Sequence, residues 1–429
     1  MRRDVLAPIV GSTSRSKYNG FRTSGWLIPA WRERRRLTQT VQSIRLERKP
    51  MAATRHFHRI ISADSHVMEP LDLWWNALGH TFGDRTPRVL DEYQGQKGTF
   101  FYSGNLGRPV AAIRGRDPET EAAAAQAEAR GMEACGYDPA VRVRFQEEAD
   151  IEAEVMNPTR LLGIMRNPDA EVVQACAQVY NDWEAAFASY NPKRLIGVSV
   201  IPMNDVAWAI EELERTLEKG LLNPMINCQA PEGCPPYRDP VYDRFWAAAS
   251  AAGAPVTLHL LTGRVLSPLG GAPDQTPEER HDNPAKWIAL FNEIQTVLAN
   301  DFIFGGILER FPDLKLVCSE YEVGWIPGFM TRLDQIDENI SRFHLPRLKM
   351  RASDYMRTRV WHGFISDTAA HYTIPYVGTS QVLWGSDFPH FRSIGLEAQS
   401  ALHELVGSLP REDQEKVVGG NAATVFNLN

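Results

Sequence analysis

Residues 60–66 read Ile-Ile-Ser-Ala-Asp-Ser-His, a short and mostly apolar run that passes directly into polar side chains. Seven further short runs of apolar or β-branched residues follow, separated by longer stretches with helical periodicity. These runs are continuously apolar, which is typical of strands buried on both faces, and the helical crossovers between them imply parallel pairing. We predict strands at 60–64, 153–156, 195–202, 221–228, 256–261, 314–319, 360–365 and 382–387.

Eight strand–helix units predict an α/β fold, specifically a (β/α)8 TIM barrel. A doubly wound open sheet is the alternative, but no glycine-rich phosphate loop follows the first strand. The predicted barrel carries an insertion at about 70–145 between strands one and two. Inside it, runs at 98–102 and 109–113 flank a turn at 103–107 and predict a β-hairpin, and the Ala/Glu-rich stretch up to residue 130 predicts a helix. The insertion and an irregular segment at 262–284 both leave the carboxyl ends of strands, so they are candidate lids over an active site.

The chain of 429 residues is 43% hydrophobic with a net charge of −7, which is typical of a globular protein. No apolar run is long enough for a transmembrane helix, so we expect no membrane partner. Residues 1–55 contain 13 Lys or Arg against 3 Asp or Glu, and we interpret them as a basic extension that precedes the barrel at 56–429. Three interpretations of the extension stay open: a dispensable tail or sequence upstream of a start at Met51, an organellar targeting segment, and a binding tail. The acidic remainder disfavours nucleic acid as a partner.

Cysteine usage indicates a reducing compartment. The five cysteines are scattered, odd in number and never spaced as Cys-x-x-Cys. The N-terminus also lacks the compact apolar core of a secretory signal. We therefore expect unpaired thiols and a cytoplasmic protein, and we do not expect a zinc–thiolate site.

Polar side chains close three of the predicted strands. Asp64 and His66 lie two residues apart in an extended segment, so both point the same way. His259 ends the fifth predicted strand, and Asp387 ends the eighth. Because the carboxyl ends of barrel strands meet at one mouth, we predict that these four residues hold a metal ion. Two carboxylates and two imidazoles suit one Zn²⁺, or alternatively Mn²⁺, with a position left open for water or substrate.

Six motifs, in this order, resemble those of a known family: DSHVMEP at 64–70, YNDW at 180–183, RLIG at 194–197, FPDLK at 311–315, GSDFPH at 385–390 and GNAA at 420–423. Over residues 58–428 the chain resembles the amidohydrolase-related family, in the branch that includes aminocarboxymuconate semialdehyde decarboxylase. The resemblance implies a metal-dependent barrel hydrolase or carboxy-lyase that acts on a small-molecule substrate and forms a homodimer. It assigns the metal to Asp64, His66, His259 and Asp387, and it gives Asp387 the further role of taking a proton from bound water. Asp64 departs from the His-x-His pattern of many relatives.

The sixth strand departs further, because family decarboxylases have a His near its end and residues 315–322 contain none. We predict that Glu320 faces the mouth instead, as a base, an additional ligand or a partner of a ligand; a carboxylate that only complements a helix dipole is the alternative. His390 is predicted to orient substrate or the acid, or else to serve loop packing. Asn157 could reach substrate or merely form a turn. Residues 221–228 offer no Lys that could bridge two metals, so one ion is favoured.

These features lead us to expect a hydrolase. The metal would lower the pKa of a bound water, Asp387 would take its proton, and the hydroxide would attack a carbonyl-type carbon of a small organic substrate. The His missing from strand six favours this reaction over the alternative, nonoxidative decarboxylation of an aromatic or unsaturated carboxylic acid. A barrel that binds metal without turnover is a second alternative, against which the completeness of the four ligands argues.

Overall fold

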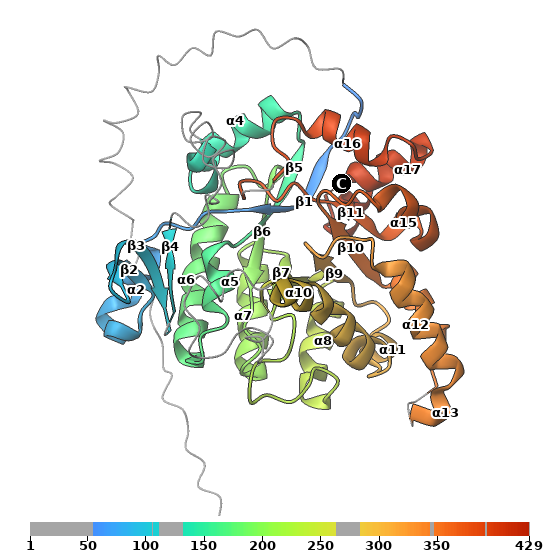
Figure 1. The fold of residues 1–429 in the computed structure, drawn as a ribbon. Helices are drawn as coiled ribbons and strands as arrows, with labels where there is room; N and C mark the ends of the chain where they lie inside the picture. Colours follow the sequence, from blue (N-terminus) through green and yellow to red (C-terminus); the bar gives the residue numbers. More distant parts are fainter. Residues whose placement is uncertain are drawn as a thin grey trace, which may run out of the picture. The chain divides into compact units, whose positions relative to one another are not determined.

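The computed structural model describes residues 55–104, 106–110, 132–262, 284–343, 347–390 and 393–428. Eight strands form one sheet in which hydrogen-bonded neighbours run parallel (Figure 1). In sheet order they are β1 (Ile61–His66), β5 (Ala153–Asn157), β6 (Leu195–Val200), β7 (Asn223–Ile226), β8 (Val256–His259), β9 (Leu316–Ser319), β10 (Val360–Phe364) and β11 (Val382–Trp384). Each overlaps one predicted run, and the TIM barrel is confirmed.

The sheet order begins with β1 and ends with β11, and hydrogen bonds between these two ends close the barrel. The backbone N–H of Asp387 donates to the carbonyl of Asp64, and the N–H of His66 donates to the carbonyl of Phe388, each over 2.8 Å. A Cβ on Gly385 would lie 2.3 Å from the Cβ of Asp64, so only glycine lets the two chains approach this closely. The seam of the barrel therefore coincides with the residues that were predicted to hold a metal.

Helices follow each strand from β5 onward, the last of them after β11, and pack against the outside of the barrel (Figure 1). They are α5 (Arg160–Ile164), α6 (Ala170–Ala188), α7 (Val206–Glu218), α8 (Asp243–Ala251), α10 (Pro284–Val297), α11 (Ile307–Arg310), α12 (Ile326–Glu338), α13 (Ile340–Phe343), α14 (Ala352–Thr358), α15 (Ala370–Val377), α16 (Ala398–Val406), α17 (Arg411–Glu415) and α18 (Asn421–Val425), with short helical turns η6 (Pro240–Tyr242), η8 (Leu298–Ile303), η9 (Thr379–Gln381) and η10 (Lys416–Gly420). Local sequence fixes several of their starts. Asp169 accepts a hydrogen bond from the N–H of Val172 and so caps α6, and Asp205 caps α7 in the same way.

The segment between β1 and β5 is the predicted insertion. It contains α2 (Leu73–Phe82), η3 (Gly83–Arg85), β2 (Arg88–Tyr93), β3 (Gln96–Ser103), β4 (Leu106–Pro109), η5 (Met132–Gly136) and α4 (Pro139–Ala149), and β2, β3 and β4 form a separate antiparallel sheet. The predicted hairpin is confirmed as β3 and β4, although β4 starts earlier than expected. The prediction missed β2, because its charged side chains Arg88, Asp91 and Glu92 leave no apolar run.

Three predictions concern segments that the structure does not describe. The helix expected up to residue 130, nearly all of the irregular segment at 262–284 and the basic extension up to residue 54 lie outside the described residues. Within the described residues, no helix has the length and apolar character that crossing a membrane requires.

Candidate metal centre

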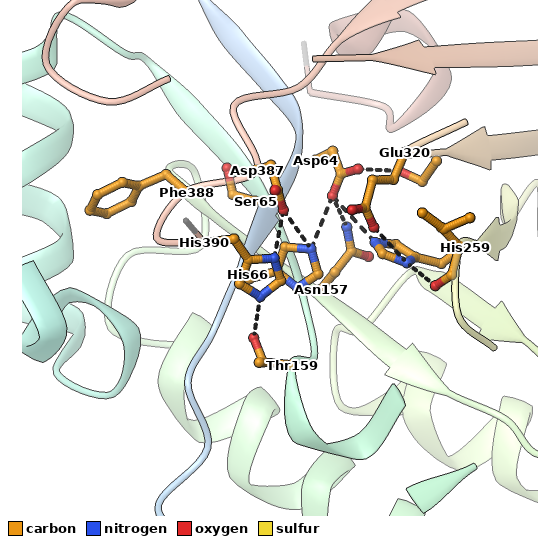
Figure 2. Close-up of polar contacts among 12 residues, drawn as sticks. Asp64, Ser65, His66, Asn157, Thr159, His259, Glu320, Asp387, Phe388 and His390 are labelled. Atoms are coloured by element: carbon orange, nitrogen blue, oxygen red, sulfur yellow. Dashed lines mark hydrogen bonds and ion pairs between the residues drawn. The ribbon is translucent and has the colours of Figure 1, made fainter. Parts of the chain in front are cut away.

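The four predicted ligands meet at the mouth of the barrel (Figure 2). Asp64 and His66 lie on β1, His259 is the last residue of β8, and Asp387 follows β11. The Nε2 atom of His66 lies 3.5 Å from Oδ1 of Asp64 and 3.3 Å from Oδ1 of Asp387, and Nε2 of His259 lies 3.5 Å from the same Asp64 oxygen. All four side chains are buried. Three strands that are far apart in sequence therefore present two carboxylates and two imidazoles to one point.

The imidazoles of His66 and His259 are oriented so that each can bind a cation through Nε2. Nδ1 of His66 donates to the carbonyl of Pro158 over 2.7 Å, and Nδ1 of His259 donates to the carbonyl of Leu260 over 2.8 Å. Because a carbonyl can only accept, each Nδ1 carries the hydrogen, and each Nε2 can present its lone pair to a cation. Neither Nε2 has a hydrogen-bond partner among the described residues, although both are buried. Such an atom is costly to bury, and a metal ion would satisfy both nitrogens.

Charge at the site also fits a divalent cation. Burial lowers the pKa of His66 to about 4, and His390 acts in the same direction, so this imidazole is neutral, the form that binds metals. Burial would raise the pKa of Asp64, but His259 and His66 outweigh it and hold the pKa well below its usual range. Burial opposes a charge on His259, yet Asp64 and then Glu320 raise its pKa to about 9. The carboxylates of Asp64 and Glu320 therefore favour a positive charge beside them, which a metal ion would supply.

Asp64 is held in place by two further side chains. Nδ2 of Asn157 donates to Oδ1 of Asp64 over 2.8 Å, and the hydroxyl of Ser319 donates to Oδ2 over 3.0 Å. Asn157, which the sequence left between a substrate contact and a turn residue, thus contacts a predicted ligand directly. Sequence reasoning missed Ser319, although it is the last residue of a predicted strand and so falls at the same mouth.

Asp387 belongs to a chain of hydrogen bonds that ends on the protein backbone. Nδ1 of His390 lies 2.7 Å from Oδ1 of Asp387, and Nε2 of His390 lies 2.9 Å from the hydroxyl of Thr159. That hydroxyl donates to the carbonyl of Val67 over 2.7 Å, so it must accept from Nε2–H. Nδ1 and Oδ1 can approach to 2.7 Å only with a proton between them. Asp387 and His390 therefore form a hydrogen-bonded pair, which Thr159 extends to the backbone.

Glu320 lies at the site, as predicted, directly after β9. Its Oε2 is 3.6 Å from Nδ1 of His259. Glu320 and Asp387 both have left-handed backbones, with φ of 67° and 54°, a conformation that is uncommon outside glycine and recurs at functional sites. Burial, with Asp387 acting in the same direction, raises the pKa of Glu320 well above its ordinary value.

Ligand atoms of Asp64, His66 and His259 lie within 4.8 Å of one another, and so do those of His66, Asp387 and His390. Both groups share His66. The group of Asp64, His66 and His259 can accommodate a single divalent ion, and the role of Asp387 as a fourth ligand stays a prediction.

The sequence matches a family model and is similar to characterised decarboxylases. The family described as Amidohydrolase matches residues 139–428. A 2-amino-3-carboxymuconate-6-semialdehyde decarboxylase from Dictyostelium discoideum is 25% identical over 304 residues, which cover 68% of this chain and 77% of the relative. A gamma-resorcylate decarboxylase from Polaromonas sp. strain JS666 is 25% identical over 304 residues, which cover 67% of this chain and 87% of the relative.

Solved structures share the fold. An amidohydrolase from Mycobacterium avium subsp. paratuberculosis has a TM-score of 0.68 at 21% identity and covers 86% of this chain and 99% of its own. A dihydroxybenzoic acid decarboxylase from Polaromonas sp. JS666, with bound manganese and the inhibitor 2-nitroresorcinol, has a TM-score of 0.60 at 19% identity and covers 87% and 98%.

The expectation of a hydrolase is wrong, because both sequence relatives are decarboxylases. The error came from treating the missing His of strand six as the feature that decides the reaction. The mouth holds other ionisable side chains, namely Asp387, His390 and Glu320, so the loss of one imidazole does not leave the site without acidic groups. The family match covers more than half of the sequence and agrees with the barrel and its motifs, and this chain therefore belongs to the amidohydrolase family.

Proposed function

We propose that this protein is a metal-dependent nonoxidative decarboxylase of an aromatic or unsaturated carboxylic acid. The observation that carries the proposal is the 2.7 Å contact between Oδ1 of Asp387 and Nδ1 of His390, beside two imidazoles whose Nε2 atoms lack partners among the described residues. Replacing a carboxylate by hydrogen needs a proton donor next to the substrate carbon, and this pair provides one. The decarboxylase names of the sequence relatives support the same reaction.

The reaction balances without a redox partner. The bond between the carboxylate and its carbon breaks, carbon dioxide leaves, and the carbon keeps the electron pair and takes a proton. Asp387 would deliver that proton, and His390 would share the charge that remains. Thr159 fixes the orientation of His390, so the proton stays at the Asp387 end of the imidazole.

A divalent ion held by Asp64, His66, His259 and Asp387 would supply the positive charge that binds the oxygens of the acid. Mixed carboxylate and imidazole ligands suit both Mn²⁺ and Zn²⁺. We propose Mn²⁺ first, because a solved structure with the same fold contains manganese. Zn²⁺, which we expected from the ligands alone, is the alternative metal.

The test is a substrate screen on purified protein loaded with Mn²⁺ or Zn²⁺. One panel contains hydroxybenzoic and unsaturated acids and is followed by carbon dioxide release; a second contains esters, lactones and amides. We expect carbon dioxide release from an acid, its loss in Asp387→Ala and His259→Ala, and no hydrolysis above buffer. Hydrolysis of the second panel with every acid inert would overturn the proposal, and so would bound metal with no turnover of either panel.

A further inference from the structure

Arg142, on helix α4 of the insertion, is completely buried, and its guanidinium lies at the seam of the barrel. Its Nε and Nη2 donate to the two carboxylate oxygens of Glu154 on β5, over 2.6 and 3.0 Å. Its Nη1 donates to the carbonyl of His66 over 2.9 Å, and Nη2 also donates to the carbonyl of Phe388 over 3.1 Å. One side chain thus connects β5, the end of β1 and the segment after β11.

The two carbonyls belong to the chain segments that present the predicted ligands. His66 is itself a predicted ligand, and Phe388 directly follows Asp387. The carbonyl of Phe388 also accepts from the N–H of His66 over 2.8 Å, so Arg142 adds a second donor to the bond that closes the seam. Movement of either carbonyl would shift an imidazole or a carboxylate of the site.

The partners of Arg142 are themselves fixed. Glu154 accepts from Nε2 of Gln146 and from the hydroxyl of Ser65, each over 2.9 Å. The ring of Phe388 is stacked on Phe145, with centroids 3.9 Å apart, and its centroid lies 4.9 Å from the guanidinium carbon. Arg142 and Phe145 both belong to α4, so this helix holds the segment after β11 through its backbone and its side chain.

We propose that Arg142 is a positioning residue, which sets the distance between the predicted ligands His66 and Asp387 by bridging the barrel seam from the inserted helix. The role rests on the metal site of the proposed function but involves no contact with metal or substrate. A guanidinium suits it because it is always charged and offers donors in a fixed planar fork. The seam bonds alone join two strand ends, whereas Arg142 ties both ends to a third element, β5, whose Asn157 holds Asp64.

The experiment compares Mn²⁺ binding by metal-free proteins, measured from the electron paramagnetic resonance signal of free and bound Mn²⁺, with the melting temperature of each metal-free protein. The main variant combines Arg142→Gln with Glu154→Gln, which avoids leaving a buried carboxylate unpaired. We expect its Kd for Mn²⁺ to rise about 10- to 100-fold, with a changed spectrum of the bound ion. Arg142→Lys keeps the charge but cannot reach both carbonyls together with Glu154, and we expect an intermediate Kd.

Arg194→Gln is the matched control. Arg194 is partly buried and donates to the carbonyl of Ile151 and to Gln146, at the end of β5 opposite the metal site. The Kd of Arg194→Gln for Mn²⁺ should therefore stay within about twofold of native, below the effect expected for a partner of a ligand. Native Kd and native spectrum in the folded double variant would overturn the proposal. If the double variant does not fold, Arg142→Lys decides, and a native Kd there would overturn it. No substrate is needed, so failure of the decarboxylase proposal would show separately in the acid screen.

Discussion

The hydroxyl of Thr159 and Nε2 of His390 are hydrogen-bonded at 2.9 Å, and this contact determines which imidazole nitrogen faces Asp387. Thr159 is the N-cap of α5, and the carboxylate of Glu69 accepts from the backbone N–H groups of Thr159, Arg160 and Leu161. Glu69, a buried acid outside the predicted ligand set, thus fixes the loop that fixes the imidazole. The orientation of His390 toward Asp387 is thus set by this loop as well as by the barrel strands.

Replacement of Thr159 by Val should therefore reduce turnover while leaving the metal bound. Without an acceptor for Nε2–H, His390 loses its fixed orientation, and we expect kcat to fall about 10- to 100-fold, the usual effect of losing a partner that orients an active group. Thr159→Ser keeps the hydroxyl and should retain most of the activity. The measurements are kcat and Mn²⁺ per chain for both variants, and full kcat in Thr159→Val would refute the role.

Ser319 should contribute to metal affinity. Its hydroxyl is a donor to Oδ2 of Asp64, so Ser319→Ala leaves that oxygen without its partner and should raise the Kd for Mn²⁺ about 10-fold. Ser199→Ala is the control, because Ser199 is also a buried strand serine but its hydroxyl has no partner among the described residues. Equal Kd values in the two variants, measured by metal titration, would contradict this prediction.

Metal removal should destabilise the folded protein. Binding to the folded state alone adds about 2.7 kcal/mol to the free energy of unfolding at a free metal concentration 100 times Kd. We expect a chelator to lower the melting temperature of native protein by several degrees and to have no such effect on His259→Ala. A native melting temperature that is insensitive to chelator and to added Mn²⁺ would show that these residues hold no ion.

Glu184 on α6 should make stability depend on pH. It is completely buried, neither of its oxygens has a partner among the described residues, and burial, with Glu69 acting in the same direction, raises its pKa well above the ordinary value of 4.5. The unfolded chain releases this proton above pH 4.5, whereas the folded chain retains it. The contribution of this group to the free energy of unfolding is thus fully present below pH 4.5. As the pH rises, that contribution falls by about 1.4 kcal/mol per pH unit until the folded-state pKa is reached.

Replacement of Glu184 by Gln removes this titration. The variant should gain stability relative to native protein as the pH rises from 5 to 9, with the smallest gain at pH 5. Urea unfolding at several pH values measures the difference, and Glu211→Gln, an exposed position on α7, is the control. Parallel pH profiles for native protein and Glu184→Gln would contradict the prediction.

The strands, and the meeting of four polar side chains at their ends, could be predicted because both depend on local pattern. Buried parallel strands are continuous apolar runs, and Asp64, His66, His259 and Asp387 stand at or just beyond their ends, where the topology brings them together. Thr159 and Arg142 could not be predicted in the same way, because their partners are set by which loops and inserted helices meet at the mouth. The main expectation of a hydrolase was wrong and the stated alternative, decarboxylation, is better supported, because the same types of ligand serve both reactions.

Closure of the barrel has a consequence for how the protein acquires its metal. The seam joins parts of the chain that are remote in sequence, as the contact between Ser62 and Ser386, 324 residues apart, illustrates. Contacts of such long range form late in folding, because the entropy of closing the loop must be overcome first. Asp387 can join Asp64 and His66 only when the last strand has docked beside the first. Tight metal capture should therefore report completed folding, and a nascent chain that lacks its final strand should bind the ion no better than an unfolded one.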